Sequence, residues 1–566
     1  GGDGEGDGED GGDTEAETET EGSDGGGGGT TETEAETEAP SSDKIGGTVD
    51  AGWLIDELVE LDPHYVDLGH QIMVHSNVFN GIVKLDPNNK IVGDLAADWS
   101  IPDDTTYVFQ LEDGVTFHNG DTLDAAAAKA SLNRLKSLDD SPHNAKAAVI
   151  DSMDASGTEL TVHLSEPTSP FLTFMVRGPG RAGTIVNAKA AEEMGREKYT
   201  RNPIGSGPFK VGERSTGESL TLNKFEDYWE TDSNGNSYPY LDQINIQLIP
   251  EASTIWSAMQ SGSIQVSSTI GGEFANQAKQ MGQFEVRAAS SGDWANVAFL
   301  SNDPAEMPEA AKYASGYDEV TDKWQNEELI TKDPKVRRAL AMAINREELV
   351  DKAYFGFAVP AHTLYNPVIG WLYEALGGEE PEPGQYYDPE KAQQLLEEAG
   401  YGDGFSATLL GDSAEDKRTT TVLQQQFSEI GVDVEVDLQQ PSAYWDKIYR
   451  YDTMLSMYGG AADIDPWMSH WRQHGTPDPD GPANIGSWSK GLHSDEEFDE
   501  LIIEDFRTPK LEDRKGILTD ANEILMENSP FGMTVFPLTP KVTSSSLKGV
   551  GIQGGLTNFH YAWLDQ

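Results

Sequence analysis

A single histidine, His118, lies in the segment 116–122 (TFHNGDT), where its imidazole has the chemistry of a metal ligand or a general base. Asn119 and Gly120 follow it directly, and Asn-Gly is a strong turn signal. A zinc site needs several ligands at set spacings, and no second ligand stands at such a spacing from His118. We therefore predict that His118 is a packed, hydrogen-bonded turn residue, and a functional role is the less favoured alternative.

Motifs of common enzyme classes are missing from the sequence. HExxH, GxSxG and GxxxxGK[ST] do not occur. Asp and Glu number 98, so neighbouring carboxylates are too common to indicate a glycosidase pair, which needs two of them at a defined distance. The sequence predicts no catalytic residues, no metal site and no cofactor.

The composition is strongly acidic. The 98 Asp and Glu against 39 Lys and Arg give a formal net charge of -59, which repels nucleic acid and thereby excludes it as a partner. Dense like charge is tolerated in concentrated salt, because screening shortens there, and we predict a halophilic protein. The lack of cysteine excludes disulfides and thiolate sites, and no apolar run is long enough to span a bilayer.

The first 43 residues differ from the rest of the chain. They contain sixteen Asp or Glu and no Lys or Arg, mixed with Gly, Thr and Ser. Such a composition cannot bury enough apolar surface to offset its ordering entropy. We predict a disordered acidic tether over residues 1–44, which holds the folded part near a membrane through a lipidated N-terminal anchor not present in this chain; the alternative is a solubility tail.

Helix and strand signals alternate from residue 45 onward. Asp333 and Asp388 each precede a proline and an amphipathic stretch, the pattern of a capped helix start with proline in the first turn. Ser494 with Glu497 predicts a capping box before another helix. The segment 432–438 alternates valine or leucine with carboxylates, as a half-buried strand does. The order of elements predicts a mixed α/β fold.

Five blocks of the sequence, in order, resemble those of one protein family. They are the blocks 61–135 (LDPHYV…SLNRL), 202–211 (NPIGSGPFKV), 336–350 (VRRALAMAINREELV), 388–401 (DPEKAQQLLEEAGY) and 462–468 (ADIDPWM). From about residue 45 to the end, the chain is similar to the family 5 solute-binding proteins of ABC importers, which include dipeptide, oligopeptide and nickel receptors. The resemblance implies an α/β, two-lobed clamshell like that of periplasmic binding proteins, with two hinge crossings.

The resemblance also implies the boundaries of the lobes. Lobe I is expected over residues 45–270, with an extra subdomain near 77–200, and again over 485–566, while lobe II is expected over 271–484. A ligand would bind in the cleft and favour the closed state by contacting both lobes.

In peptide-binding members of this family, an aspartate on the ligand-side loop pairs with the peptide ammonium. The match here is Asp463, or Asp465, because the spacing to the following Asp-Pro is one residue shorter in this chain. The alternative is that both are turn and cap residues before Pro466. Further ligand-binding candidates are aromatic and amide side chains in segments that the family places near the ligand: Trp467, Trp445, Trp488, Trp294, Asn296, Phe79 and Asn80.

Three classes of function remain. We favour a non-enzymatic, monomeric receptor that captures short peptides and delivers them to the transmembrane subunits of an ABC permease. It would lie outside the cell, tethered to the outer face of the cytoplasmic membrane. The same scaffold serves oligosaccharides and other solutes, so the ligand stays open. A secreted hydrolase and a structural surface-layer protein are the alternatives, but the sequence shows no repeat of fixed period that would favour the latter.

Overall fold

The computed structural model describes residues 40–41, 44–66, 69–376, 387–461, 464–480 and 485–565. These residues belong to one compact unit of mixed α/β structure, which confirms the predicted class. The predicted tether lies almost wholly outside the described residues, and so does Asp463. None of the helices described has the length and apolar character needed to cross a membrane.

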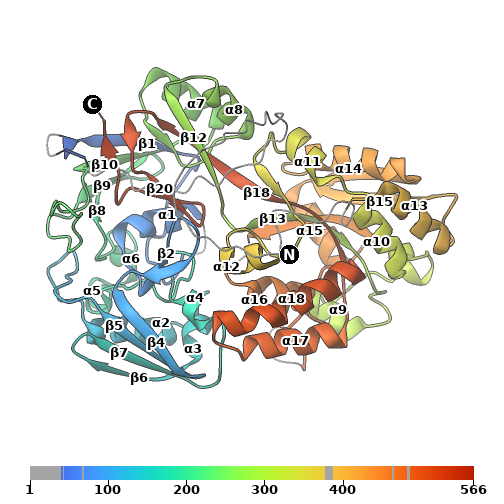
Figure 1. Ribbon diagram of the computed structural model, residues 1–566, viewed down its shortest axis with the longest axis horizontal. Helices are drawn as coiled ribbons and strands as arrows, with labels where there is room; N and C mark the ends of the chain where they lie inside the picture. The colour runs from blue at the N-terminus through green and yellow to red at the C-terminus, as the bar shows by residue number, and fades with distance from the viewer. Residues whose placement is uncertain are drawn as a thin grey trace, which may run out of the picture. The chain divides into compact units, whose positions relative to one another are not determined.

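A twelve-stranded sheet organises the fold (Figure 1). Its order is β16-β15-β17-β13-β18-β11-β1-β10-β9-β8, and β12 and β14 also pair with β18. The strands are β1 (Thr48–Trp53), β8 (Phe209–Ser215), β9 (Ser219–Lys224), β10 (Gln243–Leu248), β11 (Val266–Ser267), β12 (Phe284–Ser290), β13 (Asp293–Phe299), β14 (Ala358–Pro360), β15 (Phe405–Asp412), β16 (Val432–Gln439), β17 (Leu455–Ala461) and β18 (Phe531–Ser544).

Strand β18 belongs to both halves of this sheet. Its residues 531–537 pair with β13 and β14, and its residues 538–544 pair with β12 and β11. The chain also passes from one half to the other between β12 and β13, at Ser291 and Gly292. Helices α17 and α18, which lie after the predicted boundary at 484/485, pack against the β13 half. This packing and the pairings of β18 favour crossings at 291–292 and 537–538 over the predicted boundaries at 270/271 and 484/485. The exact lobe boundaries stay a prediction.

The remaining strands form smaller sheets. Four strands pair in the order β4-β5-β7-β6, and three hairpin-like pairs stand apart from them. Their bounds are β2 (Val83–Leu85) with β3 (Ile91–Gly93), β4 (Ala96–Asp103), β5 (Thr106–Leu111), β6 (Ile150–Ser156), β7 (Glu159–Leu164), β19 (Leu547–Lys548) with β22 (Trp563–Leu564), and β20 (Gly551–Gln553) with β21 (Leu556–Asn558).

Helices cover these sheets. Helix α14 packs on β16, and α10 packs against α13 on the same half of the large sheet. The helices are α1 (Gly69–Val78), α2 (Ala125–Ser137), α3 (Asn144–Ala148), α4 (Phe171–Phe174), α5 (Ala188–Met194), α6 (Arg196–Tyr199), α7 (Ala252–Ser261), α8 (Gly272–Lys279), α9 (Pro308–Ser315), α10 (Pro334–Met342), α11 (Arg346–Lys352), α12 (Gly370–Tyr373), α13 (Pro389–Glu398), α14 (Lys417–Glu429), α15 (Pro441–Arg450), α16 (Pro466–Ser469), the π-helix η5 (His470–His474), α17 (Glu496–Phe506) and α18 (Leu511–Asn528).

Local sequence explains where several of these helices begin. Asp333 accepts a hydrogen bond from the backbone N of Lys335 at 2.8 Å, and Asp388 does the same for Lys391 at 2.8 Å. Both aspartates precede a proline in the first helical turn, as predicted. The predicted half-buried strand is also confirmed as β16, whose first valines are buried and alternate with exposed carboxylates.

The predicted capping box at Ser494 and Glu497 is wrong by one residue. Helix α17 is capped by Asp495, whose carboxylate accepts from the backbone N of Phe498 at 3.0 Å. The same carboxylate accepts from the side-chain amide of Asn528 at 2.7 Å, a contact from the distant helix α18 that local sequence does not show.

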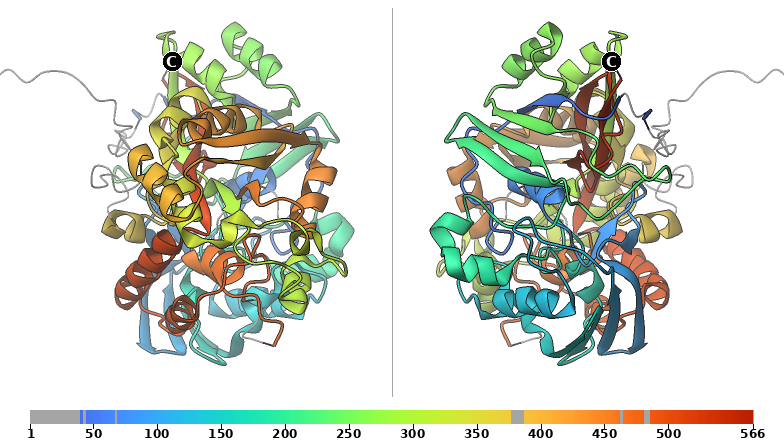
Figure 2. Two further views of the ribbon diagram at one scale, coloured as in Figure 1. Left: turned by 90° about the vertical axis from the view of Figure 1, so that its right-hand side faces the viewer. Right: turned by 90° about the vertical axis from the view of Figure 1, so that its left-hand side faces the viewer.

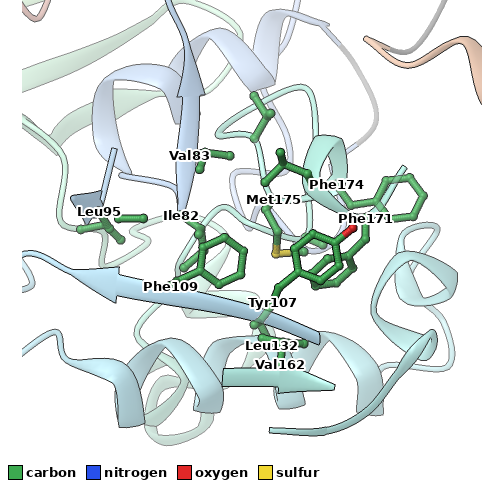
Figure 3. Packing of buried hydrophobic residues seen from close by; sticks show 14 of the residues in the cluster. Ile82, Val83, Leu95, Tyr107, Phe109, Leu132, Val162, Phe171, Phe174 and Met175 are labelled. Atoms are coloured by element: carbon green, nitrogen blue, oxygen red, sulfur yellow. The ribbon is translucent and has the colours of Figure 1, made fainter. Parts of the chain in front are cut away.

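The four-stranded sheet has an aromatic core that reaches beyond it (Figure 3). Tyr107 on β5 is fully buried, and its ring centroid lies 4.7 Å from that of Phe171. The same core includes Tyr365 and Leu372 from the segment before α12 and from α12 itself. The end of α17 lies beside α4 (Figures 1 and 2), where the backbone N of Ser169 donates to the carbonyl of Phe506 at 2.8 Å. The small sheet is thus fixed to several distant parts of the chain.

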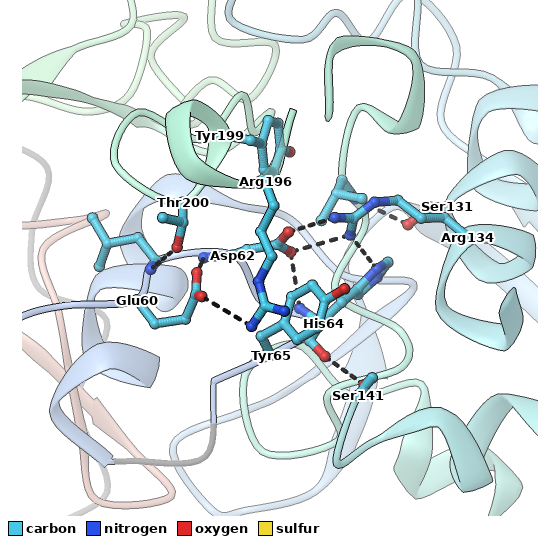
Figure 4. Close-up of polar contacts among 12 residues, drawn as sticks. Glu60, Asp62, His64, Tyr65, Ser131, Arg134, Ser141, Arg196, Tyr199 and Thr200 are labelled. Atoms are coloured by element: carbon cyan, nitrogen blue, oxygen red, sulfur yellow. Dashed lines mark hydrogen bonds and ion pairs between the residues drawn. The ribbon is translucent and has the colours of Figure 1, made fainter. Parts of the chain in front are cut away.

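A buried ion pair holds the segment 58–66 against helix α2 (Figure 4). Asp62 and His64 are both completely buried. Arg134 donates to both oxygens of Asp62, at 3.1 Å for Oδ1, and its Nη1 lies 2.6 Å from Nδ1 of His64. Burial lowers the pKa of His64 to about 3, so this imidazole is neutral and accepts at Nδ1.

Candidate functional site

A small, partly open cavity lies beside strand β13. Trp294 and Asn296, both predicted from the sequence, lie two residues apart on β13 and therefore share the face that lines it. The other lining residues come from the segment 364–369, from η5 and from β18: Leu364, Asn366, Ile369, Gln473, His474, Met533 and Phe536.

One buried side-chain polar atom of each of the two predicted residues has no hydrogen-bond partner within the described part of the chain. These atoms are Nε1 of Trp294, a donor, and Oδ1 of Asn296, an acceptor. The two residues are only 7% and 2% exposed. An unpaired buried polar group costs on the order of 1–3 kcal/mol, and groups of this kind in a cavity are suited to pair with a ligand.

Asn366 connects the cavity wall to the crossing between β12 and β13. Its side-chain nitrogen donates to the carbonyl of Asp293 at 2.7 Å, and its Oδ1 accepts from the hydroxyl of Ser290. Burial raises the pKa of the Asp293 carboxyl, and a hydrogen bond from Ser291 opposes this shift. The wall and the crossing are therefore one hydrogen-bonded structure.

Two of the predicted tryptophans lie away from the cavity lining. Trp445 on α15 stacks on Tyr449 at 5.7 Å and meets the edge of Tyr458, whose ring in turn packs on Trp294 at 5.1 Å. It therefore forms a second layer behind Trp294. Trp488 is 41% exposed and lies under the guanidinium of Arg472, 3.5 Å from the ring centroid.

Asp465 is buried in an ionic cluster. Arg514 donates to both of its carboxylate oxygens, at 2.8 and 3.0 Å, and also to both oxygens of Asp505. The backbone N of Trp467 donates to Asp465 at 2.9 Å, as in a turn. These contacts fit the alternative of a turn and cap residue, and a ligand contact by Asp465 stays a prediction, as does the role of Asp463, which lies outside the described residues.

Trp467 lies between the subdomain and α17. Its ring centroid is 6.1 Å from that of Phe174 and 5.9 Å from that of Phe506, and its buried Nε1 lacks a partner among the described residues. It does not line the cavity beside β13.

The predicted residues Phe79 and Asn80 are completely buried and do not line that cavity either. Phe79 packs edge-on against His75 at 5.5 Å. Asn80 donates to Asp94 at 3.1 Å and to the hydroxyl of Tyr228 at 3.2 Å. Their assignment to ligand binding stays a prediction.

His118 is a packed, hydrogen-bonded turn residue, as predicted. Its Nε2 lies 2.9 Å from the carbonyl of Gly207, and its ring meets the edge of Phe225 at 4.9 Å. Burial lowers its pKa to about 4. No group of three His, Cys, Asp or Glu among the residues described is placed to hold a metal ion.

Sequence reasoning missed most of the cavity wall. Asn366, Gln473 and His474 lie in segments without a recognisable motif, and Met533 and Phe536 belong to a strand that was expected only as part of the return to lobe I. The Asn-Pro pair at 366–367 marks a turn, but a turn signal alone does not indicate a binding residue.

Comparisons with known proteins agree with this architecture. Residues 90–479 match the model of the bacterial extracellular solute-binding proteins, family 5. The glutathione-binding protein GsiB of Escherichia coli (strain K12) is 25% identical over 506 residues, which cover 87% of this chain and 90% of that protein.

Two solved structures share the fold. DppA from Helicobacter pylori, in complex with the peptide STSA, is 22% identical with a TM-score of 0.66 and matches 92% of this chain and 99% of its own. A nickel ABC transporter protein from Bacillus halodurans is 24% identical with a TM-score of 0.70 and matches 91% of this chain and all (100%) of its own. The fold is thus the two-lobed clamshell of periplasmic binding proteins. The chain belongs to the family 5 extracellular solute-binding proteins of ABC importers, and its function is to bind a solute and not to catalyse a reaction.

Proposed function

We propose that this protein captures short peptides with a free amino terminus in the cavity beside β13. The observation that carries the proposal is the pair of unpaired buried atoms, Nε1 of Trp294 and Oδ1 of Asn296, on one cavity wall. A peptide backbone offers a carbonyl to accept from the indole and an N–H to donate to the amide oxygen. Backbone pairing of this kind serves any peptide sequence.

The names of similar proteins support a peptide as the ligand. GsiB is described as binding glutathione, and DppA was solved with a four-residue peptide. The resemblance to peptide-binding members adds Asp463 as the partner of the peptide ammonium, a charge-assisted bond that fixes the register of the peptide.

The strand pairings support a hinge at 291–292 and 537–538, the two points where the chain passes between the halves of the large sheet. Both points lie beside the cavity wall. All lining residues of the cavity lie between these two crossings, so a peptide bound there favours closure of the lobes by also contacting the other half. We further propose that the closed form delivers its peptide to an ABC permease, and that the protein is a halophilic, membrane-tethered monomer outside the cell.

Calorimetric titration tests the proposal with the tetrapeptide STSA, its N-acetylated form and a cello-oligosaccharide. The free peptide should bind with a dissociation constant on the order of micromolar or below. Acetylation, or Asp463→Asn, should weaken binding by about tenfold or more, because an ammonium–carboxylate bond is lost.

The matched control is Asp433→Asn, an exposed carboxylate on β16, which should leave the affinity unchanged. Equal binding of the acetylated peptide contradicts the ammonium site. Binding of the oligosaccharide without binding of peptide replaces the proposal by a sugar receptor.

A further inference from the structure

A second small, partly open cavity lies on the side of the molecule that carries β2 and the hairpin β20–β21. It shares no lining residue with the cavity beside β13. Its charged lining residues are Lys84 on β2 and Arg177 after α4, and its polar ones are Ser76 and Asn558. Among the described residues, no carboxylate lines it.

The two cations share one carboxylate, that of Asp94, at long range. Nε of Arg177 lies 3.5 Å from Oδ2 of Asp94, and Nζ of Lys84 lies 3.9 Å from Oδ1. Nη1 of Arg177 is buried and has no hydrogen-bond partner among the residues described, while the side chain as a whole is only 8% exposed. A buried guanidinium N–H without an acceptor is costly, because charged donors form the stronger hydrogen bonds.

Asp94 does not satisfy these donors, because both cations lie beyond normal hydrogen-bond distance from its oxygens, which also accept from other groups. Oδ2 accepts from the backbone N of Gly81 at 2.7 Å, and Oδ1 accepts from the side chain of Asn80 at 3.1 Å. The neighbouring carboxylate of Glu230 is likewise engaged, since it lies 3.0 Å from Nε2 of His560 and accepts from Tyr561 at 3.2 Å.

We propose that the Lys84–Arg177 cavity is a binding site for a carboxylate. A planar carboxylate matches the fork of a guanidinium and accepts from a lysine ammonium at the same time. The nearby charges of Asp94 and Glu230 favour a singly charged anion over a doubly charged one, because each added negative charge meets repulsion at short range. The carboxylate belongs either to a small free acid or to the captured solute.

Ligand-observed NMR with propionate tests the site in the full chain at constant ionic strength, with sodium sulfate as the second probe. Propionate should bind to the wild-type protein more tightly than sulfate does. Arg177→Gln and Lys84→Gln should each weaken propionate binding by about tenfold or more. Lys84 makes no close hydrogen bond within the part of the chain that the structure describes, so this variant tests the site even where Arg177→Gln does not fold.

Lys189→Gln is the matched control, since Lys189 also faces a single carboxylate at long range, 3.8 Å from Asp121, but has a side chain that is 68% exposed. It should bind propionate as the wild type does. The proposal is overturned by the absence of propionate binding, by tighter binding of sulfate, or by unchanged binding in the Lys84 variant.

A second set of titrations separates the two sources of the carboxylate and rests on the proposed peptide function. If STSA displaces propionate and its C-terminal amide does not, the site holds the carboxylate of the captured peptide. If neither displaces propionate, the site holds a separate small acid. Failure of STSA to bind anywhere contradicts the peptide function alone and leaves the propionate result decisive for the carboxylate site.

Discussion

The buried carboxylate of Asp62 on the segment 58–66 and the polar atoms of the cavity beside β13 differ in their hydrogen bonding. Both oxygens of Asp62 accept from Arg134, and the neutral ring of His64 accepts at Nδ1, while its Nε2 has no partner among the described residues. In the cavity, the indole of Trp294 and the amide oxygen of Asn296 have no partner that the structure describes. Paired buried groups hold a fold together, whereas unpaired groups in a cavity lower stability and are available to a ligand.

The largest effect is expected from breaking the ion pair. Arg134→Met keeps an aliphatic side chain but leaves the charge of Asp62 buried without its counterion, so the free energy of unfolding should fall by about 3–5 kcal/mol. Urea denaturation measures it. Arg201→Met is the control, because the Arg201 side chain is 65% exposed and only 3.9 Å from Glu197, and it should change stability by less than about 1 kcal/mol. Equal losses in the two variants would contradict the structural role of the pair.

The opposite result is expected in the cavity. Asn296→Leu preserves volume and removes an unpaired acceptor, so the free energy of unfolding should stay the same or rise by up to about 1–2 kcal/mol. Binding of STSA should weaken by about tenfold or more, because the ligand N–H loses its acceptor. Calorimetry and denaturation on one preparation give both values. A strongly destabilised variant, or one with normal affinity, would show that the two regions do not differ as argued.

The pH dependence of stability separates the regions further. Burial lowers the pKa of His64 and of His75 to about 3, well below the ordinary value of 6.5. The unfolded chain therefore binds protons that the folded chain does not, and the stability from these residues is complete above pH 6.5 and is lost as the pH falls toward 3. Each histidine contributes a slope of up to about 1.4 kcal/mol per pH unit. His75→Gln should reduce the measured slope between pH 6 and pH 4; an unchanged slope would contradict the buried neutral state.

The smallest effect concerns Asp293 beside the cavity. Its pKa is raised by burial, so the folded state holds the proton more tightly and stability from this group is lost as the pH rises above the ordinary range. Asp293→Asn should therefore raise the melting temperature slightly at pH 7 and have no such effect near pH 3. Differential scanning calorimetry at both pH values checks the sign, and a lower melting temperature at pH 7 would contradict it.

Local chemistry explains which parts of the structure the sequence predicts. The helix starts at Asp333 and Asp388 depend on an aspartate and a proline that are adjacent in the sequence, and both are confirmed. The start of α17 is misplaced by one residue, because Ser494 and Asp495 are both good caps and the choice is supported by Asn528 from another helix. The crossings of the large sheet depend on strand partners far apart in the sequence, which periodicity does not identify.

The same distinction applies to the candidate site. Trp294 and Asn296 follow from the resemblance to a known family, and both line the cavity. Asn366 and Gln473 reach it only through tertiary packing, and no spacing in the sequence indicates them. The unpaired state of a buried atom is also a tertiary property, so the Lys84–Arg177 cavity had no signal in the sequence.

The position of β18 in the chain has a consequence for biosynthesis. Both halves of the large sheet bind this strand, yet it spans residues 531–544 and is synthesised after every other strand of that sheet. Until then, β12 and the β18-facing edge of β13 lack the partner that satisfies their backbone groups. Exposed strand edges promote association with other chains. A nascent chain is therefore most exposed to misassembly just before β18 is made, and a chain that stops before residue 531 should aggregate although the other strands of the large sheet have been made.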